Sequence, residues 1–152
     1  MYIDKMDNLS KQQEDFFKSS CKKFGLKITP QRIAVYTELV KATDHPSIEA
    51  IHSRVKKKIE NVSFDTIYRT MLSFLEAGLI TLVEGTGEQK RFEPKLSNHH
   101  HCRCIKCHAI IDFEISSQID FKIPHEVRQD FTVLRERIVL EGLCKKCKTK
   151  KK

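Results

Sequence analysis

Apolar residues recur at helical spacing in four successive segments of the first half of the chain. The segments begin at Ser10, Thr29, Ser47 and Ser63, and the last three of these residues can cap the N-terminus of a helix. In the last segment the apolar residues face one side of the predicted helix, and Gly78 ends it. The pattern therefore predicts three or four short helices that share a core.

Two short runs with strand character follow the fourth predicted helix. They cover residues 79–83 and 89–93, and a glycine-containing turn from Gly85 to Glu88 separates them. A strand, a glycine turn and a second strand predict a β-hairpin. Helices followed by a basic hairpin predict a winged helix-turn-helix, with Lys90 and Arg91 beside the wing.

The second half of the chain is predicted to be rich in β-structure. Residues 109–113 have the composition of a strand, and residues 132–140 alternate between apolar and charged positions. A short helix is predicted over residues 117–129, where Pro124 would start or kink it.

The two halves predict an α+β protein with two domains. The first is a winged-helix DNA-binding domain over residues 1–93, and residues 94–98 form a hinge. Residues 99–152 form a small α/β domain. A unit of about 55 residues usually needs a metal, a disulfide or a partner subunit for stability.

Composition and charge narrow the range of binding partners and cellular compartments expected for the protein. The 152 residues include 28 Lys and Arg against 20 Asp and Glu, for a net charge of +8. This charge suits binding to a polyanion such as DNA, although the lysine-rich C-terminal tail supplies much of it and a solvated tail would explain it equally well. No apolar run approaches the ~20 residues of a membrane helix, and no secretion signal begins the chain, so we expect a cytoplasmic protein without membrane contact.

Four of the six cysteines form two CxxC pairs. They are Cys104, Cys107, Cys144 and Cys147. In a reducing cytosol such pairs are metal ligands or redox groups more often than structural disulfides, and four thiolates complete a tetrahedral zinc shell. The alternative is two unrelated pairs, one of them oxidised. We interpret Cys21 and Cys102 as ordinary small side chains.

A second group of possible ligands combines imidazoles with carboxylates. His99 and His101 lie two residues apart, so on a strand they project from one face. Glu93 and Asp112 are candidate carboxylate ligands, and His45 is a candidate from the helical half. A mixed N/O shell suits Fe(II), Mn(II), Co(II) or Zn(II). The alternative is that these are ordinary histidines, above all His45.

The fourth predicted helix carries polar side chains on its less apolar face. Tyrosine and threonine can touch phosphates or thymine methyl groups, and arginine can contact guanine or a phosphate. The face could equally be a solvated side of a core helix, but the adjoining hairpin favours DNA. The predicted DNA-binding residues are Ser63, Thr66, Tyr68, Arg69, Thr70, Lys90 and Arg91.

Motifs that span nearly the whole chain, from Phe16 to Cys147, carry a family resemblance. They are Leu26-Lys27-Ile28-Thr29-Pro30-Gln31-Arg32, His45-Pro46, Asp65-Thr66-Ile67-Tyr68-Arg69-Thr70, Phe74-Leu75-Glu76-Ala77-Gly78-Leu79-Ile80, Arg91-Phe92-Glu93, His99-x-His101-x-x-Cys104-x-x-Cys107, Ile111-Asp112-Phe113 and Gly142-Leu143-Cys144-x-x-Cys147. In order and spacing they resemble the ferric uptake regulator family.

The resemblance implies a winged helix followed by an α/β dimerisation domain. It also implies a bacterial transcriptional repressor that binds operator DNA as a homodimer when metal is present; a tetramer is the alternative. Structural zinc would be held by the two CxxC pairs, and the helix containing Tyr68 and Arg69 would contact DNA. The residues that match the family's regulatory metal site are His45, Glu93, His99, His101 and Asp112.

The sensed signal depends on a few of these residues. Glu93 is similar to the iron-sensing branch of the family, whereas Asp112 is closer to the peroxide-sensing branch. We therefore predict an Fe(II)-sensing repressor of iron homeostasis genes, with Mn(II) or Zn(II) as alternative regulatory metals. A peroxide-sensing repressor is the first alternative. A metalloenzyme is the alternative from another class, but the chain has no HExxH motif, and we predict that it is not an enzyme.

Overall fold

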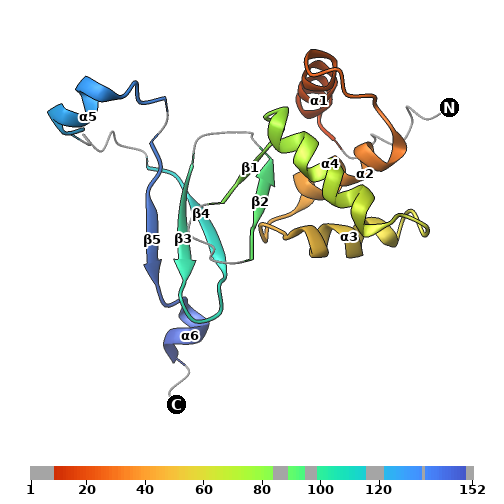
Figure 1. Cartoon of the computed structure of the whole chain (residues 1–152). Coiled ribbons are helices and arrows are strands. Elements are labelled where there is room, and N and C mark those ends of the chain that lie inside the picture. The colour runs from red at the N-terminus through yellow and green to blue at the C-terminus, as the bar shows by residue number, and fades with distance from the viewer. Residues whose placement is uncertain (1–8, 84–88, 95–98, 116–121, 135, 150–152) are drawn as a thin grey trace. The chain divides into compact units, whose positions relative to one another are not determined.

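A computed structural model describes residues 9–83, 89–94, 99–115, 122–134 and 136–149 of the chain (Figure 1). The chain divides into two compact units, Met1–Leu96 and Ser97–Lys152. The predicted wing, Gly85 to Glu88, and residues 95–98 of the predicted hinge lie outside the described residues. No helix in the described ranges is long and apolar enough to cross a membrane.

The described residues of the first unit form four helices. They are α1 (Lys11–Lys23), α2 (Pro30–Lys41), α3 (Ile48–Lys56) and α4 (Phe64–Glu76). Each begins after a capping hydroxyl, from Ser10, Thr29, Ser47 or Ser63, which accepts a hydrogen bond from the backbone N–H three residues further on. The predicted caps are thereby confirmed. Such a bond satisfies one of the N–H groups that a helix leaves unpaired at its start.

An aromatic cluster lies at the centre of the first unit. The rings of Phe17 and Tyr36 stack with centroids 4.7 Å apart, and Phe74 of α4 meets both rings edge-on. All three side chains are fully buried, which fixes α1, α2 and α4 around one core. Gly78, with φ of +65°, ends α4 in a left-handed conformation that suits glycine.

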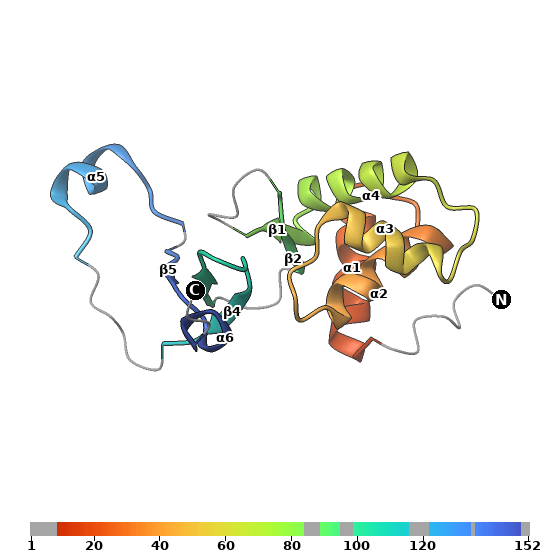
Figure 2. The same cartoon turned by 90° about the horizontal axis from the view of Figure 1, so that it is seen from below.

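A short hairpin follows α4 at one end of the helices (Figures 1 and 2). Strand β1 (Ile80–Leu82) pairs antiparallel with β2 (Phe92–Pro94), and Thr81 lies opposite Glu93. The two predicted strands are present but shorter than expected, and Pro94, assigned to the hinge, is the last residue of β2. Phe92 is buried in the core of the unit, so β2 is anchored beside the helices.

The second unit is built on a three-stranded sheet in the order β4-β3-β5. Strand β3 (His100–Cys104) is central, pairing antiparallel with β4 (Ile110–Phe113) and parallel with β5 (Val139–Gly142). Two short helices, α5 (His125–Asp130) and α6 (Lys145–Thr149), complete the described part. Among the described residues of this unit only His101, Cys104 and Ile110 are buried. The unit therefore has little apolar core of its own.

Two predictions for the second half need correction. The strand expected over 132–140 begins only at Val139, and Leu134, an apolar residue of the alternating segment, is 91% exposed. The ladder between β3 and β5 starts at the pair His101–Val139. In the described part of the unit, the residues before Val139 therefore have no strand to pair with. The helix expected over 117–129 is limited to α5, which begins directly after Pro124, and residues 117–121 lie outside the described ranges.

Candidate metal centres and nucleic-acid interface

The two CxxC pairs meet because β3 and β5 are parallel neighbours. Cys104 ends β3 and lies opposite Gly142 at the end of β5, so the turns that follow both strands leave the same edge of the sheet. Cys107 lies in the turn between β3 and β4, Cys144 lies two residues after the end of β5, and Cys147 lies on α6. Residues far apart in the sequence are thus gathered at one corner of the unit.

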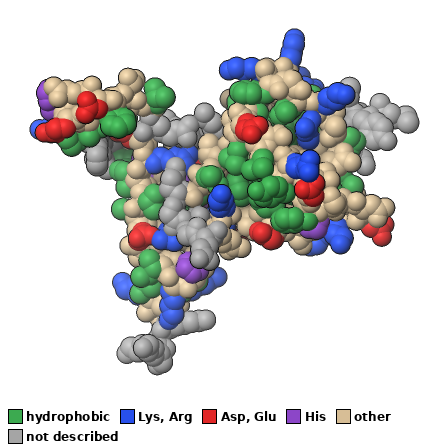
Figure 3. Space-filling model, viewed as in Figure 1, with side chains coloured by type: hydrophobic (Ala, Val, Ile, Leu, Met, Phe, Trp, Pro, Cys, Tyr) green, Lys and Arg blue, Asp and Glu red, His purple; other side chains and the backbone are tan. Residues whose placement is uncertain are grey.

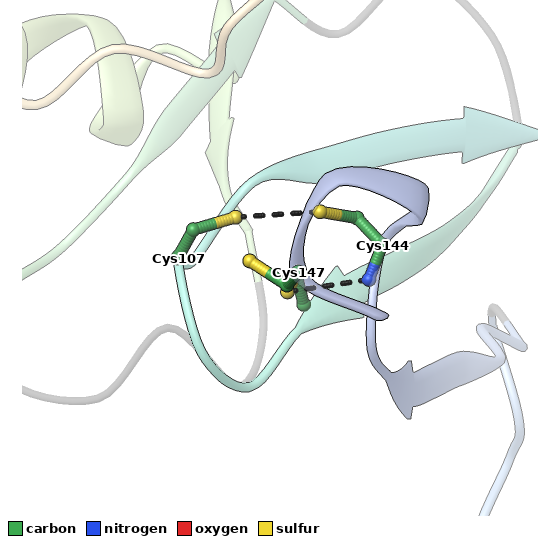
Figure 4. A group of neighbouring side chains, drawn as sticks. Cys107, Cys144 and Cys147 are labelled. Atoms are coloured by element: carbon green, nitrogen blue, oxygen red, sulfur yellow. Dashed lines mark hydrogen bonds between the residues drawn. The ribbon is translucent and has the colours of Figure 1, made fainter. Parts of the chain in front are cut away.

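The sulfur positions match the shape of a tetrahedral metal shell. The four Sγ atoms lie within 4.8 Å of one another, and those of Cys107 and Cys144 face each other at 3.7 Å (Figure 4). Four sulfurs at about 2.3 Å from a central zinc would lie about 3.8 Å apart. The backbone N–H of Cys144 also donates to Sγ of Cys104 at 3.4 Å, a contact typical of a thiolate. The donor set and its spacing therefore fit zinc.

The cysteines of this cluster differ in acidity. Hydrogen bonds from the backbone at Cys144 and Cys107 lower the pKa of the Cys104 thiol to about 5. Burial, together with hydrogen bonds to neighbouring thiols, raises the pKa of Cys147 to about 12. At neutral pH the metal-free cluster therefore holds Cys104 as a thiolate and Cys147 as a thiol.

Zinc affinity is expected to rise with pH across the neutral range. Binding must displace the Cys147 proton, which makes the affinity increase by about tenfold per pH unit for each proton released. Below pH 5 the Cys104 thiolate is protonated as well, so the fall in affinity becomes steeper. Competition with a chromophoric chelator at several pH values, corrected for the chelator's own protonation, measures this dependence. An affinity that stays constant from pH 6 to 8 would contradict it.

In the first unit an imidazole lies beside a carboxylate. Nε2 of His45 lies 3.3 Å from Oε2 of Glu93, and both side chains are buried. His45 lies in the turn between α2 and α3, and Glu93 lies on β2. The hydroxyl of Thr81, on the neighbouring strand β1, donates to Oε1 of Glu93 at 3.3 Å. The pair is held by two elements and offers a nitrogen and an oxygen ligand.

The second unit holds a group of two imidazoles and one carboxylate. Nε2 of His99 and Nε2 of His101 lie 3.1 Å apart, so both project from one face, as the spacing predicts. Asp112 lies directly opposite His101 on β4, and its oxygens are 3.5 Å from His101 and 3.8 Å from His99. His101 is only 1% exposed. Two nitrogens about 2.1 Å from one metal would be separated by roughly this distance.

These two groups suit a transition metal that prefers mixed N/O ligands. Neutral imidazole and carboxylate bind Fe(II), Mn(II) and Zn(II), and the sulfur cluster of the second unit is a separate ligand set. The first unit supplies two donors and the second supplies three. Each group alone leaves positions of a five- or six-coordinate metal for other ligands.

Helix α4 presents part of its predicted DNA-binding set to solvent. Tyr68 is 43% exposed, and the Arg69 side chain, which pairs with Asp65 at 2.8 Å, is also exposed. The hydroxyls of Ser63 and Thr70 form hydrogen bonds with the backbone of α4 itself. The Ser63 hydroxyl caps the helix, and the buried Thr70 donates to the Thr66 carbonyl at 2.8 Å. The exposed hydroxyphenyl and guanidinium groups are thus the groups of α4 best placed to reach a partner.

A second row of apolar side chains on α4 was not predicted from the sequence. Phe64, Tyr68 and Leu72 follow each other at intervals of four residues, and each is at least 40% exposed. Figure 3 shows hydrophobic side chains gathered over this helix, with Lys and Arg side chains beside them. The ring of Phe64 stacks on Tyr68, which orders the start of the row. Such a surface can contact thymine methyl groups in a major groove.

The two basic residues of the hairpin differ in their surroundings. Lys90 is exposed, as expected for a group that contacts a phosphate. Arg91 is half-buried, and its guanidinium donates to the backbone carbonyls of Asp44 and His45.

The helical unit, its exposed α4 and the two kinds of metal-ligand cluster define the class of metal-responsive, helix-turn-helix transcriptional regulators. The chain belongs to the ferric uptake regulator family, whose sequence pattern matches residues 23–140. Members of this family regulate transcription and are not enzymes, which excludes the metalloenzyme alternative. The predicted fold class and the predicted role as a metal-binding repressor are confirmed.

Individual relatives place the chain within the family. The peroxide-responsive repressor PerR of Staphylococcus epidermidis is 32% identical over 130 residues, which cover 86% of this chain and 87% of the relative. The ferric uptake regulator Fur of Helicobacter pylori, a structure described with three functional metal binding sites, is 25% identical. It superposes with a TM-score of 0.73 over 93% of this chain and 95% of its own. A zinc-bound manganese uptake regulator is 26% identical, with a TM-score of 0.64 over 84% of this chain and 97% of its own.

Proposed function

We propose that the chain is an Fe(II)-dependent repressor that binds operator DNA as a homodimer in the cytoplasm. The observation that carries this proposal is the presence of one imidazole–carboxylate group in each unit, in which His45, Glu93 and His101 are buried. Burying ionisable groups is costly unless they pair or bind a metal, and such ligand sets suit a divalent transition metal. The exposed α4 supplies the surface for DNA.

In this proposal one regulatory metal is shared by both units. His45 and Glu93 bind it from the first unit, and His99, His101 and Asp112 bind it from the second. Sharing these five ligands restricts how the units move about residues 94–98. Since a ligand shifts a conformational equilibrium only through tighter binding to one state, the DNA-binding arrangement must be the one that brings all five ligands together.

The four cysteines have a different role in the proposal. Cys104, Cys107, Cys144 and Cys147 hold structural zinc, which stabilises a unit that buries only three of its described residues. The same unit forms the dimer. Its exposed apolar residues, which a second copy of the chain can cover, include Ile111, Phe131, Leu134 and Leu140. A two-fold dimer presents two copies of α4 about 34 Å apart, one turn of DNA.

The proposed DNA contacts come from α4 and the hairpin. Tyr68 and Arg69 are the central residues, with Thr66 nearby, and Lys90 contacts a phosphate. The exposure of Tyr68 and Arg69 supports this assignment. Ser63 and Thr70 support the interface from within the helix, because their hydroxyls hold the first turns of α4 in place.

Peroxide-responsive repression is the second candidate function. The curated relatives with 29–32% identity are named peroxide-responsive repressors, and Asp112 of this chain is closer to the peroxide-sensing branch. Glu93 distinguishes the two candidates at the residue level, because the iron-sensing branch carries glutamate there. The two candidates share ligands and DNA surface and differ in whether bound Fe(II) leads to oxidation of a ligand.

An anaerobic DNA-binding titration tests the proposal. Duplexes selected from a random library by the Mn(II)-loaded, zinc-containing protein serve as probes, and Fe(II), Mn(II) and Zn(II) are then compared. We expect operator affinity to depend on added metal, and Tyr68→Ala to lose DNA binding while it retains metal binding. If a chelator that removes only the more weakly bound metal left operator affinity unchanged, regulation by that metal would be contradicted. Mild peroxide then separates the candidates, because a mass gain of 16 Da on His45 or His99 supports peroxide sensing.

A further inference from the structure

The backbone at His45 adopts a conformation that side-chain-bearing residues avoid. Its φ is +49°, in the left-handed region, although the residue is not glycine. Such a conformation is unfavourable and persists only where the surroundings impose it. Since this backbone aims the imidazole at Glu93, the orientation of a proposed metal ligand depends on contacts that hold the turn.

The contacts that hold this turn come from Arg91, just before β2, and from Phe92, the first residue of β2. The guanidinium of Arg91 donates through Nε to the carbonyl oxygen of His45 and through Nη2 to that of Asp44, the latter at 2.7 Å. The backbone N–H of Phe92 donates to the carbonyl oxygen of Pro46 at 3.1 Å. Three successive carbonyl groups, at residues 44–46, are therefore bound by two adjacent residues, Arg91 just before β2 and Phe92 at its start.

The same short segment also carries the carboxylate of the pair. Glu93 lies two residues after Arg91, so the two side chains project from one side of the extended chain. Arg91 fixes the backbone of His45 while Glu93 faces its imidazole at 3.3 Å. The position of both ligands of the first unit is thus determined by residues 91–93.

We propose that Arg91 is a positioning residue for the regulatory metal site. Its guanidinium binds the carbonyls of Asp44 and His45 and holds the imidazole of His45 in the orientation that ligates metal. The inference rests on the proposed function of His45 and Glu93 as ligands. The two parallel N–H donors of arginine match two adjacent carbonyls, which the single ammonium group of lysine cannot reproduce.

This role differs from a phosphate contact. If Arg91 turned toward DNA, the turn at His45 would lose two hydrogen bonds and the metal would be held more weakly on DNA. Because Arg91 is half-buried with its donors engaged, whereas Lys90 is exposed, the geometry assigns the phosphate contact to Lys90. The two neighbours therefore provide a matched pair of variants.

The experiment compares Arg91→Lys with Lys90→Gln in the full-length, zinc-loaded protein. Mn(II) affinity is measured without DNA by electron paramagnetic resonance, and operator affinity is measured at saturating Mn(II). We expect Arg91→Lys to weaken Mn(II) binding by roughly 10–100-fold, the usual effect of losing a partner that orients a ligand. Its operator affinity at saturating metal should stay within about threefold of the wild type. Lys90→Gln should weaken operator binding and leave Mn(II) affinity unchanged.

Thermal unfolding separates positioning from general support of the fold. A structural role would lower Tm equally with and without Mn(II), whereas a positioning role makes the Mn(II)-induced rise in Tm smaller in Arg91→Lys. If the variant does not fold, NMR of the wild type replaces it. The Nε–H of Arg91 should exchange slowly with solvent, both free and bound to DNA.

Wild-type Mn(II) affinity in Arg91→Lys, or rapid exchange of the Arg91 Nε–H, overturns the inference. Metal-dependent DNA binding by the wild type, together with an unaffected variant, refutes the role of Arg91 alone. A variant with weakened Mn(II) binding, in a protein whose DNA binding ignores metal, refutes the proposed regulation and leaves the positioning role intact.

Discussion

Replacing Cys104 by serine is expected to abolish zinc binding and to unfold the second unit. Cys104 is one of only three buried residues in the described part of that unit, and its sulfur accepts the backbone N–H of Cys144. Structural zinc contributes about 10–16 kcal/mol of binding free energy in small zinc-finger peptides. A whole domain is stable by only about 5–15 kcal/mol. The loss of one ligand therefore removes more free energy than this unit can replace.

Zinc content and amide NMR spectra of the full-length variant measure this effect. We expect less than one zinc ion per chain and loss of the dispersed signals from β3, β4 and β5, while the helices of the first unit keep their signals. Cys102→Ser is the matched control, because Cys102 lies on the same strand but outside the sulfur cluster. A Cys104→Ser protein that retains both zinc and the sheet would show that the cluster is not structural.

Replacing both His99 and His101 by alanine is expected to abolish metal-dependent operator binding. The two imidazoles lie 3.1 Å apart and supply two of the three donors of the second unit. With only Asp112 remaining there, the proposed site keeps one donor of the second unit. The loss in Mn(II) affinity should exceed the roughly 10–100-fold that follows from losing an outer-shell partner. Fluorescence anisotropy of labelled operator, titrated with Mn(II), measures the response.

The neighbouring histidine provides the control for this variant. His100 projects away from the other two and accepts the backbone N–H of Ile138 through Nδ1 at 3.1 Å. In His100→Asn the amide oxygen can take the place of Nδ1, so the sheet contact is kept and the metal response should stay within about threefold of the wild type. Unchanged metal-dependent DNA binding in the double alanine variant would refute the proposed sensing site.

The features that were predictable from the sequence depend on nearby residues or on distinctive chemistry. Ser47 and Ser63 cap helices through contacts only three residues long, and a serine before an apolar periodic run signals such a cap. The four cysteines are similarly predictable, because the CxxC spacing is itself a metal-ligand geometry. His99 and His101 follow from the two-residue period of a strand.

The features that sequence reasoning missed depend on distant partners. The alternation over residues 132–140 suits a strand, but whether a strand forms depends on a neighbour, and β3 reaches only as far as the pair with Val139. Arg91 contacts backbone carbonyls that are 46 and 47 residues away in the sequence, so the residues next to Arg91 in the sequence give no signal of these contacts. The row of Phe64, Tyr68 and Leu72 did have a signal, a second set of apolar residues spaced by four.

The central position of β3 has a consequence for the order in which metals load. The strand carries His101 and, three residues later, Cys104, so one ladder register places both the imidazole group and the sulfur cluster. A shift of that register by one residue would turn the other face of the strand toward Asp112. If the cysteines hold zinc as proposed, zinc at the end of the strand would stabilise this register, and the second metal is expected to bind best after zinc has bound. Under that proposal, cells short of zinc would hold fewer molecules able to respond to the second metal.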